Sequence, residues 1–122
     1  MADNGRVIVG CTHSVEDPDR VLVAYLTAGA ALDQGKDVVM WLSSEGVRLA
    51  LRGYVDPIRA DREPPVKRVH EQFIEKGGRF YVCPICFNER KLDQEQLVEC
   101  AELQGATPLM QFAADGAVTF NY

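Results

Sequence analysis

The fold class is decided by the stretch Arg6-Val-Ile-Val-Gly-Cys11. Consecutive β-branched residues without polar alternation are typical of a strand that is buried on both faces, as in a parallel sheet covered by helices. A polar turn follows, and then Asp17-Pro18. Asp is a suitable N-cap and Pro fits the first helical position, so the sequence predicts a buried strand followed by a helix.

The same alternation of buried strands and helices continues along the chain. Further strands are predicted near Val38–Ser43, Arg79–Cys83, Pro108–Phe112 and Val118–Tyr122, and helices are predicted to begin near Asp17, Ser44, Pro65 and Asp93. This order predicts an α/β fold, a three-layer α/β/α open sheet that is mostly parallel, with the flavodoxin-like strand order 2-1-3-4-5. The length of 122 residues indicates a single domain, 1–122.

Composition and charge exclude several classes of function. The chain is 47% hydrophobic and 25% charged, as in an ordinary folded protein, and its net charge of −5 argues against nucleic acid and anionic membranes as partners. Met1-Ala-Asp-Asn-Gly5 has no basic segment followed by an apolar run. We therefore expect a cytoplasmic protein whose four cysteines are reduced.

The least regular segment is Gly53–Pro65, which is rich in proline and charge and is predicted to be a surface loop. It contains the large apolar residues Tyr54, Val55 and Ile58. Apolar side chains in an otherwise charged loop are candidates for contacts between subunits.

The most informative motif is Cys83-Pro-Ile-Cys86, directly after the third predicted strand. Open α/β sheets place their working residues at the carboxyl ends of strands. Because Pro84 fits a first helical position, Cys83 is predicted to be the N-cap of a short helical turn. Backbone N–H groups at a helix N-terminus favour the thiolate form of a cysteine, so Cys83 is the candidate nucleophile.

The end of the first strand, Cys11-Thr-His13-Ser, offers a second candidate. In a flavodoxin-like order the first and third strands are neighbours, about 4.8 Å apart, which would bring Cys11 close to Cys83. The interpretation that we favour is simpler: Cys11 is a small buried hydrophobic residue, and His13 lies in a solvated turn.

Other polar and sulfur-containing residues have structural explanations. Cys100 is predicted to pack in the core from a helix that also carries Leu97 and Ala101, and His70 to lie on a helix surface between charged neighbours. Asp17 is interpreted as a helix cap. The sequence has no glycine-rich phosphate loop and no serine nucleophile motif, and we expect no cofactor.

Over essentially its whole length the chain resembles the DsrE/DsrF-like sulfur-relay family, in particular its CxxC-containing subset. The resemblance rests on the turn Glu16-Asp-Pro18, a small-residue helix closing in Gly35, the segment Ser44-Glu-Gly-Val-Arg-Leu49, and Tyr81-Val-Cys83 before a charged loop. Where sulfur-relay members tend to continue with Arg-Gly, this chain has Arg90-Lys91.

The resemblance implies a small cytoplasmic protein that assembles as a trimer or hexamer and exchanges sulfur with donor and acceptor proteins. It maps Cys83 onto the cysteine that accepts a persulfide sulfur, so the chain would be a sulfurtransferase or persulfide carrier. Cys86 matches a second cysteine of the subset, to which the resemblance assigns no role.

Three other functions remain open at this stage. Cys83 and Cys86 with Cys11 and His13 are a conceivable zinc site, although a closed site requires four ligands. A thioredoxin-type dithiol is disfavoured because the CxxC comes late, after three predicted helices. The last alternative is an interaction module with this fold and no chemistry.

Overall fold

The structure is a computed structural model that describes residues 4–60 and 64–122. Residues 1–3 and residues 61–63, which fall within the predicted surface loop Gly53–Pro65, lie outside the described residues.

The centre of the molecule is a five-stranded sheet whose neighbouring strands are all parallel. Its members are β1 (Arg6–Cys11), β2 (Asp37–Leu42), β3 (Arg79–Val82), β4 (Ala101–Leu103) and β5 (Val118–Asn121). The predicted class of sheet is therefore confirmed, and β1 lies inside the sheet, as its apolar run requires.

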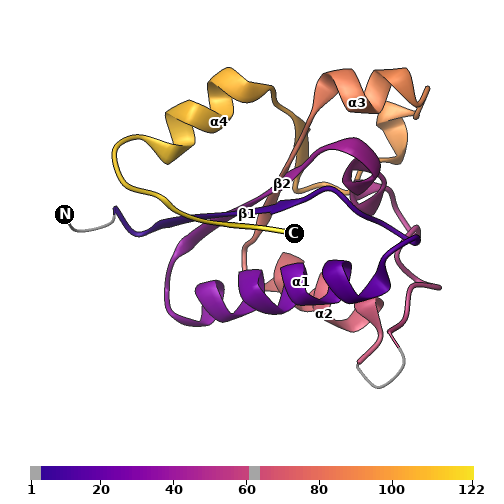
Figure 1. Cartoon of the computed structure of the whole chain (residues 1–122), viewed down its shortest axis with the longest axis horizontal. Helices are drawn as coiled ribbons and strands as arrows, with labels where there is room; N and C mark the ends of the chain where they lie inside the picture. The colour runs from indigo at the N-terminus through magenta and orange to yellow at the C-terminus, as the bar shows by residue number, and fades with distance from the viewer. Residues whose placement is uncertain (1–3, 61–63) are drawn as a thin grey trace.

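Helices cover both faces of the sheet (Figure 1). The α-helices are α1 (Pro18–Asp33), α2 (Val66–Glu75), α3 (Pro84–Glu89) and α4 (Ala106–Ala113), and the 3₁₀ helices are η1 (Ser44–Ala50) and η2 (Gln94–Gln96). On one face α1 and α2 enclose the larger hydrophobic core, and on the other face α4 covers a smaller cluster around Phe112. These three layers are the predicted α/β/α architecture.

The strand order differs from the flavodoxin-like prediction. The observed order is β4-β3-β2-β1-β5, so β2 lies between β1 and β3. The chain adds β2, β3 and β4 in one direction, and α4 then carries it back across the sheet to place β5 beside β1. The five short parallel strands carry no local sequence signal for their lateral order, which depends on how each crossover packs.

Two predicted elements near the carboxyl terminus are wrong. The predicted strand Pro108–Phe112 belongs to α4, where Pro108 occupies the first turn and costs no helical hydrogen bond. The helix predicted from Asp93 is only the short η2, and Ala101 and Leu103, at strand spacing, form the edge strand β4 instead.

The segment after η1 also differs from the prediction. Val55 and Ile58 are buried in the larger core and Tyr54 is half-buried, because this part of the loop folds back over the core. Val55 and Ile58 are therefore not available as subunit contacts.

Among residues 4–60 and 64–122, no helix has the length and apolar character needed to cross a bilayer.

Candidate thiol site at the carboxyl end of β3

Cys83 follows β3 directly and is the N-cap of α3, as predicted. Its backbone N–H donates a hydrogen bond to Leu42 O at 2.9 Å, which continues the β2–β3 pairing by one residue. Its carbonyl accepts from Phe87 N at 3.0 Å, and Pro84 occupies the first helical position. The side chain is half-buried and makes no capping hydrogen bond. The backbone of this cysteine is therefore fixed, while its side chain is only partly buried.

Cys86 lies one turn along α3 and is also half-buried. Its carbonyl accepts a hydrogen bond from Arg90 Nη1 at 3.1 Å. Arg90 Nε also donates to Glu45 Oε2 at 2.7 Å, so one guanidinium joins the end of α3 to the start of η1. This contact fixes the helical turn that carries both cysteines.

Glu45 has a second cationic partner, since Arg48 Nε donates to Glu45 Oε1 at 2.9 Å. The hydrogen bond from Arg90, and then the one from Arg48, lower the pKa of Glu45. The same ion pair raises the pKa of Arg90, and a charged Cys86 thiolate would add to that effect. Of these two guanidinium groups, that of Arg90 contacts α3 directly, through its hydrogen bond to the Cys86 carbonyl.

The 3₁₀ helix η1 is held against the end of β1 through Gly46. A Cβ atom on Gly46 would lie 2.0 Å from the carbonyl oxygen of Cys11, so only glycine fits at this approach. Glu45 therefore binds Arg90 from a segment that is packed directly on the sheet.

Cys11 is buried and does not share a site with Cys83, because β2 separates their strands. The predicted proximity is wrong, and the interpretation of Cys11 as a buried hydrophobic residue is confirmed. Its thiol donates to His13 O at 3.6 Å, and burial raises its pKa to about 11. The Cys11 thiol is therefore protonated at neutral pH.

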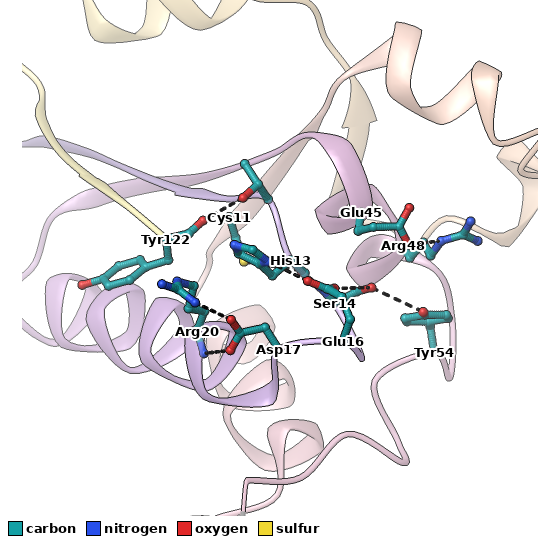
Figure 2. Close-up of polar contacts among 11 residues, drawn as sticks. Cys11, His13, Ser14, Glu16, Asp17, Arg20, Glu45, Arg48, Tyr54 and Tyr122 are labelled. Carbon is teal, nitrogen blue, oxygen red and sulfur yellow. Dashed lines mark hydrogen bonds and ion pairs between the residues drawn. The ribbon is translucent and has the colours of Figure 1, made fainter.

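His13 belongs to a separate polar cluster at the end of β1 (Figure 2). His13 Nδ1 lies 2.6 Å from Glu16 Oε2, and the other oxygen of Glu16 accepts from Ser14 N. Ser14 Oγ and the Tyr54 hydroxyl are 3.5 Å apart. The sequence signal for the His13–Glu16 pair is the spacing of three residues between its members.

Among the remaining candidates, the prediction for Asp17 is correct, whereas those for Cys100 and His70 need correction. Asp17 caps α1, as predicted, by accepting from Arg20 N. Cys100 packs against the core, but from the turn before β4 rather than from a helix, and burial raises its pKa.

His70 is buried, not on the surface. It stands four residues after Val66 and three before Phe73, which places it on the apolar stripe of α2. Within the described ranges 4–60 and 64–122, no three His, Cys, Asp or Glu side chains are arranged to hold a metal ion.

Residues 5–122 match the sequence profile of the DsrE/DsrF-like family. The chain belongs to the DsrE/DsrF-like family. Membership points to sulfur relay as the role at the level of the family. Among solved structures, the YchN protein of E. coli superposes with a TM-score of 0.74 at 21% identity, covering 98% of this chain and 100% of YchN. MTH1491 of Methanobacterium thermoautotrophicum, a protein of unknown function, gives 0.67 at 16% identity, with 96% and 98% covered.

Two curated relatives of this DsrE/DsrF-like chain are uncharacterized archaeal proteins. MK0008 of Methanopyrus kandleri is 32% identical over 85 residues, covering 70% of this chain and 67% of the relative. MJ0760 of Methanocaldococcus jannaschii is 23% identical over 101 residues, which is 83% of this chain but 37% of the relative. The match thus spans little more than a third of MJ0760.

The bridge through Arg90 makes a testable prediction about α3. In Arg90→Ala we expect the amide of Phe87 to exchange its hydrogen several-fold faster, because the end of α3 loses its link to Glu45. Arg90→Lys should give an intermediate exchange rate, because a lysine ammonium lacks the two separate N–H groups with which the guanidinium reaches Glu45 Oε2 and Cys86 O. Arg20→Ala, which removes a remote ion pair with Asp17, is the control and should leave Phe87 unchanged. Unchanged exchange in Arg90→Ala would show that packing alone holds α3.

Proposed function

We propose that this DsrE/DsrF-like protein is a persulfide carrier, a sulfurtransferase that accepts a sulfur atom on Cys83 and passes it on. The observation that carries the proposal is the position of Cys83, fixed by its backbone at the end of β3 and at the head of α3, with a partly exposed thiol. Of the other cysteines, Cys11 is buried and burial raises the pKa of Cys100, so neither is suited to exchange.

The reaction that this site would perform is thiol–persulfide exchange. The Cys83 thiolate attacks the outer sulfur of a donor persulfide, the donor S–S bond breaks, and the donor leaves as a thiolate. Cys83 then carries the persulfide, and an acceptor thiolate removes the outer sulfur by the same step in reverse. Each transfer exchanges one S–S bond for another, so no oxidant, reductant or cofactor is consumed.

Cys86 is proposed as an auxiliary residue in this exchange. It lies on the same turn of α3, and its carbonyl accepts a hydrogen bond from the Arg90 side chain. The positive charge of Arg90 would stabilise an anionic persulfide held beside the two cysteines. We further propose that the carrier works in the cytoplasm as a homo-oligomer, a trimer or hexamer, with separate donor and acceptor proteins.

Sulfur uptake from a small-molecule persulfide tests the proposal. Cys83→Ser should lose uptake altogether because serine cannot form a persulfide, whereas Cys86→Ser should keep most of it. Cys100→Ser, which removes another half-buried thiol at a distance from α3, is the matched control and should behave like the parent. If Cys83→Ser and Cys86→Ser both take up sulfur like the parent, the carrier proposal fails, and a zinc-binding or interaction role on this fold takes its place.

A further inference from the structure

The two edges of the sheet are built differently. One edge is β4, which has only three residues and carries the charged side chain of Glu102. The other edge is β5, where Val118-Thr-Phe-Asn121 has no charge and no proline and every residue is exposed. Charged side chains and proline are among the usual protections of a sheet edge against pairing, and the four residues of β5 include neither.

The backbone of β5 presents hydrogen-bonding groups to that open edge. Tyr122 N donates to Gly10 O at 2.8 Å, and Thr12 N donates to Tyr122 O at 2.9 Å, so the polar backbone groups of Tyr122 face β1. Because these groups alternate along a strand, those of Val118 and Phe120 also face β1. Those of Thr119 and Asn121 therefore face outward.

The side chains of β5 add an apolar surface to this edge. Val118 is 38% exposed and Phe120 44% exposed, and both point to the face of the sheet that α1 covers. Val23 on α1, which lines a groove together with Tyr122, is also exposed, at 41%. Apolar side chains that line an unprotected strand edge mark an interaction surface.

We propose that β5 pairs with β5 of a second copy of this chain, antiparallel and across a two-fold axis at Phe120. In this register Thr119 and Asn121 exchange backbone hydrogen bonds with Asn121 and Thr119 of the second copy. The two Phe120 side chains then meet in the close, non-hydrogen-bonded pair, and Val118 faces the other Tyr122. The strand is complementary to itself, so the partner that it fits is a second copy.

The charges beside β5 agree with this two-fold arrangement. An apolar groove of about 290 Å³ at the start of β5 is lined by Lys36, Val118 and Phe120 among others. A more open groove at the end of β5 is lined by Asp17, Asp19, Arg20, Val23 and Tyr122, and it is net acidic because Arg20 balances one carboxylate. Antiparallel pairing places the end of one copy that carries Lys36 opposite the end of the other copy that carries Asp17 and Asp19.

This inference does not depend on thiol chemistry. A closed assembly that contains the β5 pairing has a two-fold axis and therefore an even number of subunits, so of the trimer and hexamer proposed above it is compatible with the hexamer only.

Cross-linking at a single position tests the register. In a Cys83→Ser, Cys86→Ser background, Phe120→Cys should form a covalent dimer under mild oxidation, because Cα atoms of a non-hydrogen-bonded pair are about 4.5 Å apart, within disulfide reach. Thr119→Cys is the matched control, since Thr119 residues of the two copies would lie more than about 7 Å apart and should not cross-link.

A second variant measures the assembly itself. Thr119→Pro removes an outward N–H without touching the pairing of β5 with β1, and it should halve the mass measured by light scattering. The proposal is overturned if the parent is a monomer at micromolar concentration, if Thr119→Pro keeps the parent's mass, or if Phe120→Cys cross-links no faster than Thr119→Cys.

Discussion

Lowering the pH from about 7.5 to about 5 should remove about 2 kcal/mol from the free energy of unfolding through His70 alone. His70 is 6% exposed, and its ring stacks on Phe80 with the ring centres 5.6 Å apart. Its Nδ1 shares a hydrogen bond of 2.6 Å with the hydroxyl of the fully buried Tyr25. Burial lowers the pKa of His70 from 6.5 to about 4, against a smaller opposite effect of the Asp56 carboxylate.

The direction of the effect follows from which state binds the proton. The unfolded chain protonates His70 near its ordinary pKa, whereas the folded protein holds the ring neutral. The stabilisation is therefore complete above about pH 6.5 and is lost as the pH falls toward 4.

The measurement is urea unfolding of the parent and of His70→Gln across this pH range. Glutamine keeps a hydrogen-bonding group for Tyr25 but does not titrate, so the pH-dependent loss in the variant should be smaller by about 2 kcal/mol. The variant also serves as the control for carboxylates, such as Glu45, that lose stabilisation at lower pH. Equal losses in parent and variant would show that His70 is not buried in its neutral form.

Gly46→Ala should destabilise the protein by about 3 kcal/mol, because overpacking against a rigid neighbour is among the most costly substitutions. The new Cβ atom would lie 2.0 Å from Cys11 O and 2.9 Å from Cys11 C. Both atoms belong to the backbone of β1, and the oxygen accepts a hydrogen bond from Ser43 N. Neither β1 nor η1 can move without loss of contacts.

Gly29→Ala is the matched control for this substitution. Gly29 lies within α1, and a Cβ atom there meets nothing within 4 Å. Replacing a helical glycine by alanine should stabilise the protein by up to about 1 kcal/mol. Thermal or urea unfolding compares the two variants with the parent, and a Gly46→Ala variant as stable as Gly29→Ala would contradict the close packing of η1 on β1.

The sequence predicted the elements that have strong local signals. The β-branched run of β1 and the Asp17-Pro18 start of α1 were placed correctly because burial and capping are readable from neighbouring residues. Cys83 was placed correctly as an N-cap because Pro84 fixes the first helical position. Signals of this kind do not need the rest of the fold.

Features that depend on distant segments could not be predicted in the same way. Glu45 and Arg90 are 45 residues apart and meet only because η1 and α3 lie at neighbouring strand ends. The position of β5 beside β1 likewise depends on the return of the chain through α4. The burial of His70, in contrast, could have been predicted from the sequence. Its spacing from Val66 and Phe73 places it on the apolar stripe of α2, but its charged sequence neighbours led to the prediction of a surface position.

The most direct test of the proposed function is to locate the sulfur atom after uptake. The native protein is treated with a limiting amount of a small-molecule persulfide, the thiols are trapped by alkylation, and the peptides are analysed by mass spectrometry. We expect a mass increase of one sulfur atom, about 32 Da, that fragmentation assigns to Cys83, with no added sulfur on Cys11 or Cys100. Added sulfur on Cys86 or Cys100 with none on Cys83, or no added sulfur on any cysteine, would contradict the proposal that Cys83 is the carrier.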